Sequence, residues 1–126
     1  MANAACPFCQ QRKVLFENEL AYVIPDAYPV NPGHLLIIPR SHIADFFLIT
    51  EQERAALMTL LDQAKRYLDE KHAPAGYNIG INVGETAGKT VMHLHVHLIP
   101  RYRGDMPDPR GGVRGVIPAK QSYPSA

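Results

Sequence analysis

The sequence predicts an α+β fold that combines several short strands with one long helix. Apolar and polar residues alternate in residues 77–83 and again around three histidines in residues 88–101, and strict alternation is typical of a half-buried strand. In residues 50–71 the apolar side chains recur at helical spacing instead, which is typical of a helix with one buried face. We therefore expect both kinds of element in one small domain.

Length and composition indicate a single domain over residues 1–126. Hydrophobic residues make up 46% of the chain and charged residues 20%, which suits a packed core. A formal net charge of +1 provides no electrostatic reason to expect nucleic acid or an anionic membrane as a partner. The sequence has no apolar run of transmembrane length and no secretory signal pattern, so we expect a cytoplasmic protein.

The first segment, residues 1–13, is expected to form an irregular arm. It carries both cysteines of the chain, Cys6 and Cys9. A disulfide between cysteines so close in sequence would not staple a fold, so the spacing favours a redox pair or half of a metal site in a reducing compartment.

The next elements are predicted to be three short strands. Residues 14–17 and 20–24 are apolar runs bounded by polar residues, as in short strands. Residues 25–33 contain three prolines and a glycine and are expected to form a loop. The uninterrupted apolar run at residues 35–38 suits a central strand that is covered on both faces.

A short helix is predicted at residues 42–47, followed by a long helix that ends near Lys71. Thr50 and Glu53 form a capping-box pattern at the start of the long helix, because each side chain can bond the other residue's main-chain N–H. Residues 73–76 contain proline and glycine and should end it. Its buried stripe is predicted to be Leu57, Leu60, Leu61, Ala64 and Leu68.

A hairpin is expected where residues 84–88, which contain two glycines, join the two alternating segments. It would place Asn82 on the same side of the sheet as the three histidines. The tail, residues 102–126, is rich in proline and glycine and should be mostly irregular, with residues 113–117 as a candidate edge strand.

The three histidines, His93, His95 and His97, alternate with aliphatic residues. On a strand their imidazoles share one face at intervals of about 6.6 Å. If the segment has no catalytic role, it is a half-exposed strand that is rich in histidine, or a tract that binds metal incidentally. A catalytic zinc bound by all three is a rival enzymatic reading, but the side chains would span about 13 Å, which is far for bonds of about 2.1 Å.

The run His-Leu-His-Val-His-Leu-Ile resembles the signature of the histidine triad family. Residues 33–42 and 82–97 are similar to two further blocks of that family, and residues 24–26 lie where the family contacts a nucleoside. The resemblance covers residues 6–103. The cysteine pair is similar to zinc-bearing bacterial members, whereas the Pro-Arg-x-x-Gly-Asp stretch at residues 100–105 is similar to the fragile histidine triad branch.

This resemblance implies an antiparallel sheet with one long helix and a short helix packed on it. It also implies a homodimer that joins two sheets through the long helix and a strand. The implied activity is hydrolysis or transfer of nucleotides at the α-phosphate, with dinucleoside polyphosphates as the preferred substrates. A purine nucleoside phosphoramidase and a non-enzymatic nucleotide sensor are the alternatives.

The resemblance assigns catalytic roles to four histidines. His95 would be the nucleophile, because imidazole is nucleophilic while neutral and its neutral form is abundant near pH 7. His97 would bind a phosphate oxygen or the leaving atom, His93 would orient the triad, and His34 would lie near the phosphate. A main-chain carbonyl in residues 84–88 is the expected acceptor that fixes the His95 tautomer.

The nucleotide contacts are also implied by the resemblance. Asp26 would accept both ribose hydroxyls, with a turn-forming role as the alternative. Ile24 would line the base pocket or belong to the core. Asn82 and Thr90 would donate to phosphate, and Gly88 would let the main chain approach it.

Lys89 departs from the family pattern, in which many members have glutamine. An ammonium only donates hydrogen bonds and is a point charge. Lys89 would either contact the distal phosphates of a polyphosphate substrate or point to solvent.

A structural Zn²⁺ is the implied metal, and no organic cofactor is implied. By the resemblance its ligands would be Cys6, Cys9, His42 and His93. Four such ligands complete a tetrahedral site with no open position, so the metal would pin the arm to the sheet.

Overall fold

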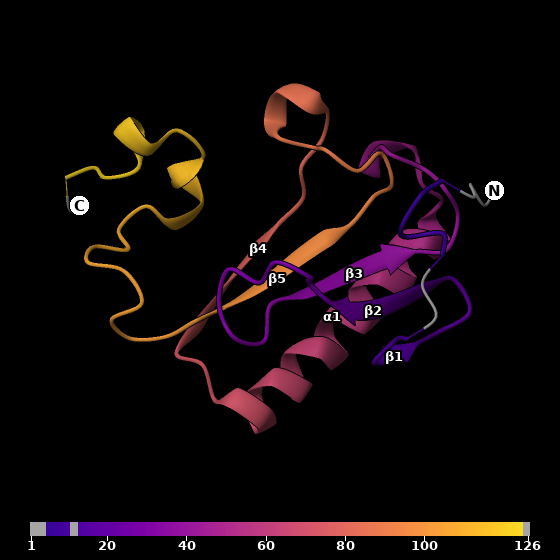
Figure 1. Cartoon of the computed structure of the whole chain (residues 1–126), viewed down its shortest axis with the longest axis horizontal. Helices are drawn as coiled ribbons and strands as arrows, with labels where there is room; N and C mark the ends of the chain where they lie inside the picture. Colours follow the sequence, from indigo (N-terminus) through magenta and orange to yellow (C-terminus); the bar gives the residue numbers. More distant parts are fainter. Residues whose placement is uncertain (1–4, 11–12, 125–126) are drawn as a thin grey trace.

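The computed structural model describes residues 5–10 and 13–124. Five strands form one antiparallel sheet in the order β1-β2-β3-β5-β4, and the long helix α1 (Glu51–His72) lies across one face of it (Figure 1). The predicted α+β class is confirmed. The strands are β1 (Phe16–Glu17), β2 (Ala21–Pro25), β3 (Leu35–Pro39), β4 (Gly76–Gly80) and β5 (Val96–Arg101). Short 3-10 helices in the described residues are η1 (Phe46–Leu48), η2 (Glu85–Ala87), η3 (Gly112–Val116) and η4 (Pro118–Lys120).

The strand β3 is buried along its whole length, as its continuous apolar run predicts. Toward α1, Val23, Ile37 and Val96 stand side by side in register across three strands and belong to the main core. The opposite face of the sheet carries a second, smaller core of Tyr22, Ile24, Leu36 and Ile38.

The long helix follows its prediction closely. Thr50 accepts from the main-chain N–H of Glu53, and the Glu53 carboxylate accepts from that of Thr50, so the capping box forms. The helix ends at His72, one residue beyond the prediction, and Ala73 turns the chain in the left-handed region with a φ of 46°. Of the predicted stripe, Leu61 is partly buried, and the fully buried members are Leu57, Leu60, Ala64 and Leu68.

The short helix predicted at residues 42–47 is wrong in extent. Only the single turn η1 forms, and the Asp45 carboxylate caps it by accepting from the main-chain N–H of Phe47. The carbonyl of Ile43 accepts from Leu94 N–H at 2.8 Å. This tertiary hydrogen bond holds the segment in an irregular conformation that brings His42 toward the N-terminal arm.

The hairpin between β4 and β5 forms, but its connection is longer than predicted and spans residues 81–95. The predicted strand over residues 88–101 is therefore wrong in its first half. Leu94 N–H bonds to Ile43 and not to a neighbouring strand. As a result His93 and His95 lie ahead of the strand.

The tail forms two 3-10 turns, η3 and η4 (Figure 1), which contact each other, and η3 also contacts β4. The candidate edge strand at residues 113–117 is wrong, because Gly111 and Gly112 have φ values of 86° and 43° and turn the chain before it can extend. The Arg114 guanidinium then donates to two carbonyls further along the tail. Within the described residues, no helix is long and apolar enough to span a membrane.

Candidate active site and metal cluster

The alternation predicted for the histidine segment is confirmed for its side chains. Leu94, Val96 and Leu98 are buried in the main core beneath α1. His95 and His97 point to the opposite face, and their ring centroids are 5.0 Å apart. The aliphatic residues therefore anchor a segment that presents imidazoles on its other side.

The His95 ring is oriented by its own main chain. Its Nδ1 lies 2.8 Å from the main-chain oxygen of His93. A carbonyl only accepts, so Nδ1 carries the proton and Nε2 keeps its lone pair. The predicted acceptor is a main-chain carbonyl, as expected, but its predicted location in residues 84–88 was wrong. The extended segment instead brings the carbonyl of His93, two residues upstream, within reach of the ring.

Burial keeps the His95 imidazole neutral. Desolvation lowers its pKa, the hydrogen bond to the His93 carbonyl opposes this, and the nearby His97 and Lys89 lower it further. The neutral form therefore prevails near pH 7, and neutral imidazole is the nucleophilic form.

His34 and His97 form a directional hydrogen-bond chain. The main-chain N–H of Val30 lies 3.0 Å from His34 Nδ1, so this nitrogen accepts. The proton of neutral His34 is then on Nε2, which lies 3.0 Å from His97 Nδ1. Because His97 Nδ1 accepts in turn, Nε2–H of His97 is left as a donor. Burial lowers the pKa of both rings, which favours this neutral arrangement.

Asp26 contacts both the turn and the histidines. Its Oδ1 accepts from Tyr28 N–H at 2.8 Å, so the turn-forming alternative is correct as far as it goes. Its Oδ2 lies 3.4 Å from His34 Nε2. The carboxylate also lines the cavity described next, and its role toward a ribose stays a prediction.

A cavity of about 580 Å³ opens over this side of the sheet, a volume typical of small-molecule sites. Phe8, Lys13 and Tyr28 also line it, and none of these was anticipated. The position of Phe8 between the two cysteines was the only available signal. The predicted residues that line the cavity are Ile24, Asp26, Asn82, Gly88, Thr90, His95 and His97.

The loop that leads into the histidine segment depends on a glycine and a buried lysine. Gly88 has a φ of 103° and open space at its Cβ position, so the backbone conformation alone requires glycine. Lys89 is only 2% exposed, and its ammonium donates to the main-chain oxygen of Asn82 at 3.2 Å. Burial lowers the pKa of Lys89. The solvent-facing alternative is therefore wrong.

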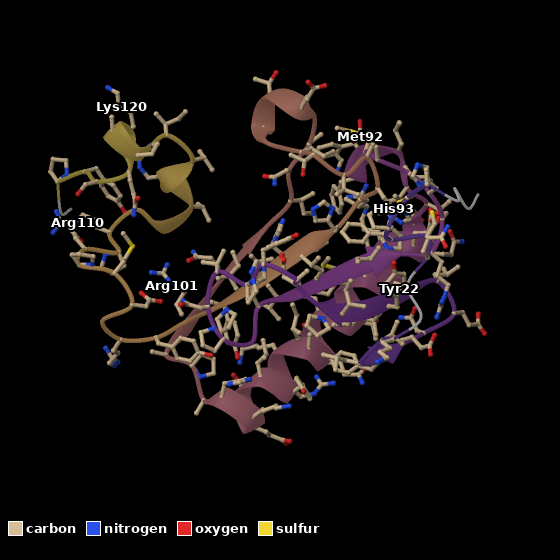
Figure 2. All side chains as sticks on the ribbon, viewed as in Figure 1. Tyr22, Met92, His93, Arg101, Arg110 and Lys120 are labelled. Carbon is tan, nitrogen blue, oxygen red and sulfur yellow. The ribbon has the colours of Figure 1, made fainter. Side chains whose placement is uncertain are left out.

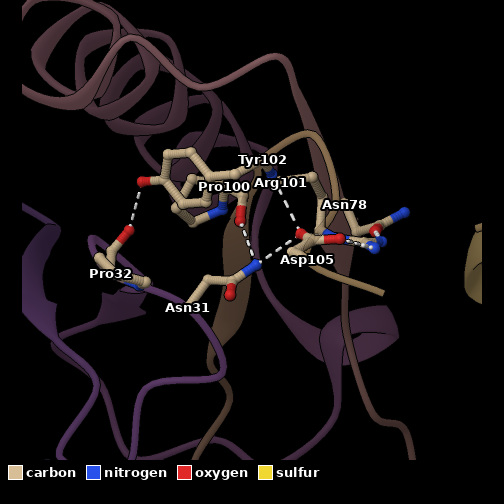
Figure 3. Close-up of polar contacts among 7 residues, drawn as sticks. All are labelled: Asn31, Pro32, Asn78, Pro100, Arg101, Tyr102 and Asp105. Carbon is tan, nitrogen blue, oxygen red and sulfur yellow. Dashed lines mark hydrogen bonds and ion pairs between the residues drawn. The ribbon is translucent and has the colours of Figure 1, made fainter. Parts of the chain in front are cut away.

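A polar clamp connects the start of the tail to the loop before His34 (Figure 3). The Asp105 carboxylate accepts two hydrogen bonds from the Arg101 guanidinium, both at 2.8 Å, and a third from the Asn31 side-chain amide at 2.8 Å. The main-chain oxygen of Asn31 accepts from His34 N–H at 3.1 Å. The Pro-Arg-x-x-Gly-Asp stretch therefore supports the loop that carries His34, a role that no sequence pattern predicted.

The second cluster gathers the four predicted metal ligands. Cys6 Sγ lies 3.4 Å and Cys9 Sγ 3.5 Å from His93 Nδ1, and all four ligand atoms, including His42 Nδ1, lie within 4.8 Å of one another. A tetrahedral Zn²⁺ with bonds of about 2.0–2.3 Å separates its ligand atoms by about 3.3–3.8 Å. Figure 2 places His93 at the end of the sheet near the N-terminal arm, away from Arg101.

The nitrogens in this cluster are arranged for a cation. His93 Nε2 lies 2.7 Å from the main-chain oxygen of Pro39, so Nε2 carries the proton and Nδ1 presents a lone pair. Nδ1 of His42 lies only 3.2 Å from Nδ1 of His93. Two facing ring nitrogens beside two free thiols fit a Cys2His2 metal site with no open position.

The rival reading of a catalytic zinc on all three triad histidines is wrong. His93 is fully buried and its free nitrogen faces the cysteines, while His95 and His97 line the cavity. Among the described residues, neither group with metal-ligand geometry contains all three.

The fold and the site define an α+β domain in which neutral histidines line a cavity of small-molecule size. The chain belongs to the HIT domain family, whose profile matches residues 9–104.

Two curated relatives carry activity names. AP-4-A phosphorylase of Mycobacterium tuberculosis is 38% identical over 93 residues, which cover 73% of this chain and 48% of that protein. The asymmetrical bis(5'-nucleosyl)-tetraphosphatase of Schizosaccharomyces pombe is 32% identical over 93 residues, which cover 74% and 51%. The chain spans about half the length of these relatives.

Solved structures agree with the fold. A HIT family protein from Bacillus anthracis is 31% identical with a TM-score of 0.76, covering 81% of this chain and 77% of that one. A Zn-bound histidine triad family protein from Mycobacterium smegmatis is 31% identical with a TM-score of 0.72, covering 82% and 80%.

Proposed function

We propose that this chain hydrolyses nucleotide conjugates at the α-phosphate, with dinucleoside polyphosphates as the preferred class. The observation that carries this proposal is the His95 ring, whose Nδ1–H is held by a main-chain carbonyl so that Nε2 is free to attack. The names of the two relatives, a phosphorylase and a tetraphosphatase, support the substrate class.

The reaction has two steps. Nε2 of His95 attacks the α-phosphorus, an N–P bond forms, and the bond from phosphorus to the bridging oxygen breaks. His97 Nε2–H donates to that oxygen as it leaves. Water then attacks the nucleotidyl-His95 adduct and releases a nucleoside monophosphate, which restores the free imidazole.

The other cavity residues would hold the nucleotide. Asp26 would accept from the ribose hydroxyls, and Ile24 with Phe8 would contact the base. Asn82 and Thr90 would donate to the α-phosphate oxygens. All of these residues line the same cavity, which supports these roles.

A structural Zn²⁺ in the Cys2His2 cluster completes the proposal. The Zn-bound relative and the distances among the ligand atoms support it. The ion would contribute cross-linking between the N-terminal arm and the sheet, and no catalytic step uses it. Elemental analysis of protein purified without a histidine tag should give one zinc per chain, and a metal-free protein with both thiols reactive would reject the site.

We also propose a cytoplasmic homodimer. β4 is an outer strand of the sheet and Ile79 on it is 50% exposed, which supports pairing through this edge and the long helix. The two free cysteines suit a reducing compartment. Light scattering should give twice the mass of the chain, and a monomer at micromolar concentration would reject the dimer.

Trapping the adduct tests the proposed function. Diadenosine tetraphosphate labelled at the α-phosphate is mixed with the protein and quenched within milliseconds in alkaline detergent, since N–P bonds of this kind hydrolyse in acid. The native chain and His72→Ala, which changes an exposed histidine, should retain label, whereas His95→Ala should not. Label retained by His95→Ala would refute the mechanism. AMP release by His95→Ala at the native rate, with no labelled adduct, would also refute it.

The acceptor is tested in the same assay. Water gives AMP from the adduct, whereas inorganic phosphate would give ADP. Release of AMP alone in the presence of phosphate supports a hydrolase, and ADP as the main product would make the chain a phosphorylase.

A further inference from the structure

The N-terminal arm places an aromatic ring between the two histidine clusters. Phe8 stands between Cys6 and Cys9 in a tight turn, in which the Cys9 main-chain N–H donates to the Cys6 carbonyl at 3.2 Å. The centroid of the Phe8 ring is 5.0 Å from that of His95, at an interplanar angle of 65°. It is also 5.9 Å from the centroid of His93, at 87°. One side chain therefore contacts both the proposed nucleophile and a proposed metal ligand.

Two kinds of contact hold this turn against the sheet. The Tyr22 hydroxyl on β2 donates to the main-chain oxygen of Phe8, and the Phe8 side chain packs on the small core to which Tyr22 belongs. On either side of Phe8, the sulfur atoms of Cys6 and Cys9 lie 3.4 and 3.5 Å from His93 Nδ1. A metal ion bound by both sulfurs would fix the two residues that flank the ring.

The Phe8 ring restrains an imidazole that a single hydrogen bond does not orient fully. The bond from Nδ1 to the His93 oxygen fixes one atom of the His95 ring, but the ring can still tilt about that contact. Phe8 has no hydrogen-bonding group in its side chain, so its edge contact limits the tilt without competing for Nε2. Both rings border the same cavity. A nucleophile reacts well only when neighbouring side chains hold it close to the line of attack.

We propose that Phe8 is a positioning residue for His95, and that the Cys2His2 cluster influences the active site through this ring. The inference rests on the proposed function, since it takes His95 as the nucleophile. With a metal bound, Cys6 and Cys9 hold the turn and the ring stays against the imidazole. Without the metal, the turn loses a restraint on each side of Phe8 and the ring gains freedom to move away. An ion that takes part in no catalytic step thereby affects the rate of attack.

A fluorescence experiment tests whether the metal positions the ring. The chain contains no tryptophan, so Phe8→Trp provides a single reporter at this position. Its emission maximum should move to longer wavelength when a chelator strips the zinc-loaded protein, because the indole becomes hydrated. Phe16→Trp is the matched control, since Phe16 lies on β1 and packs against Tyr67 of α1, and its emission should not change. An unchanged emission in Phe8→Trp, or equal shifts in both variants, would overturn the coupling.

A kinetic experiment tests whether the ring positions His95. The rate of adduct formation is measured in a single turnover at saturating diadenosine tetraphosphate. Phe8→Ala should lower this rate about tenfold, whereas Phe8→Leu, which keeps much of the bulk, should stay within about threefold of the native rate. Val14→Ala is the control, because Val14 packs on the same small core but does not line the cavity, and it should react at the native rate. A loss confined to KM would mean that Phe8 contacts only the base, and would overturn the positioning role.

The two experiments are joined by a cycle of metal removal and substitution. Stripping the native chain should lower the rate of adduct formation about tenfold, but stripping Phe8→Ala should change it less than about twofold, because the ring that transmits the effect is already absent. Equal losses in the two proteins would overturn the coupling, since the metal would then act through the whole fold.

Tyr22→Phe repeats the cycle in zinc-loaded protein, so that the test stands even where stripping unfolds the chain. It removes the hydrogen bond to the Phe8 main chain and should leave one zinc per chain. The rate of adduct formation should fall about threefold in the native background and not at all in Phe8→Ala. A native rate in Tyr22→Phe would overturn the role of the arm in holding the ring.

Failure of the inference differs from failure of the proposed function. If the native, zinc-loaded chain forms no adduct on His95, the proposed function fails, and the catalytic role of Phe8 fails with it. If the adduct forms at the same rate in the native chain and in Phe8→Ala, only the inference fails.

Discussion

His93 and His95 lie two residues apart on one extended segment, yet their rings serve different sites. In each of these two histidines, one ring N–H donates a hydrogen bond to a main-chain carbonyl. The Pro39 carbonyl accepts from Nε2 of His93 and leaves Nδ1 facing the cysteines. The His93 carbonyl accepts from Nδ1 of His95 and leaves Nε2 for the cavity. The proposed metal ligand and the proposed nucleophile thus differ in which ring nitrogen the main chain holds.

This contrast shows why the two histidines are not interchangeable. The His93 side chain supports the fold, while its main-chain oxygen orients the catalytic ring. A substitution that removes the His93 side chain leaves that oxygen in place. Side-chain and main-chain roles of one residue can therefore be separated by experiment.

The largest expected effects come from two single variants, in which His95 or His93 is replaced by alanine. His95→Ala should lower kcat for diadenosine tetraphosphate by about 10⁴-fold, because the nucleophile is lost, with little change in Tm. His93→Ala should lower the free energy of unfolding by about 3 kcal/mol, because a ligand and its buried partners are lost, while the protein still forms the adduct. Steady-state kinetics and urea unfolding measure the two effects.

The comparison would be refuted if His93→Ala, still folded at low temperature, failed to form the adduct. His93 would then act on catalysis through its side chain.

The next effect concerns the clamp behind His34. Asp105→Asn removes the carboxylate that pairs with Arg101 and should lower kcat/KM by about 30-fold, because the loop that positions His34 shifts. Loss of this pairing acts only through position, so kcat should fall more than KM rises. Asp108→Asn is the matched control, since Asp108 caps only its own turn through Oδ1, and asparagine keeps that oxygen. Equal effects of the two substitutions would contradict the clamp.

A smaller effect is expected in the pH dependence of stability. Burial lowers the pKa of His34 and His97 below the ordinary value of 6.5, so the unfolded chain binds protons first as the pH falls. Stability is then complete above about pH 6.5 and decreases below it, by about 1 kcal/mol between pH 6.5 and 5.5. Urea unfolding across this range measures the slope. His34→Gln should make the slope shallower, and an unchanged slope in that variant would contradict the assignment.

The smallest effect is expected at Lys89. Its ammonium bonds to the main chain of Asn82, so Lys89→Gln should lower kcat/KM by about threefold for diadenosine tetraphosphate and for adenosine 5'-phosphoramidate alike. A loss confined to the dinucleoside substrate would instead place the ammonium on a distal phosphate.

Local patterns predicted the elements whose stabilisation is local. The capping box and apolar stripe of α1 and the continuous run of β3 were sufficient, because both depend on spacing within one segment. The short helix at residues 42–47 and the first half of the histidine strand failed for one reason. The hydrogen bond between Leu94 and Ile43 joins segments far apart in sequence, and its tertiary partner replaces the expected local one.

The residues of the site likewise fall into those that the sequence predicted and those that it did not. Residue types and their resemblance to the family identified the histidines, the cysteine–histidine cluster and seven of the fifteen residues that line the cavity. Phe8, the clamp at Asp105 and the burial of Lys89 were missed, because each depends on where the arm, the tail and a loop pack against the sheet.

By itself the sequence determined the alternation that sends aliphatic side chains to one face of the segment and imidazoles to the other. It also determined which residue types gather near them. Only the tertiary structure decided which ring nitrogen of each histidine is free, and that Asp105 at the start of the tail supports the loop before His34. The physical reason is that both depend on the positions of carbonyls and surfaces contributed by distant segments, and spacing along one segment does not specify those positions.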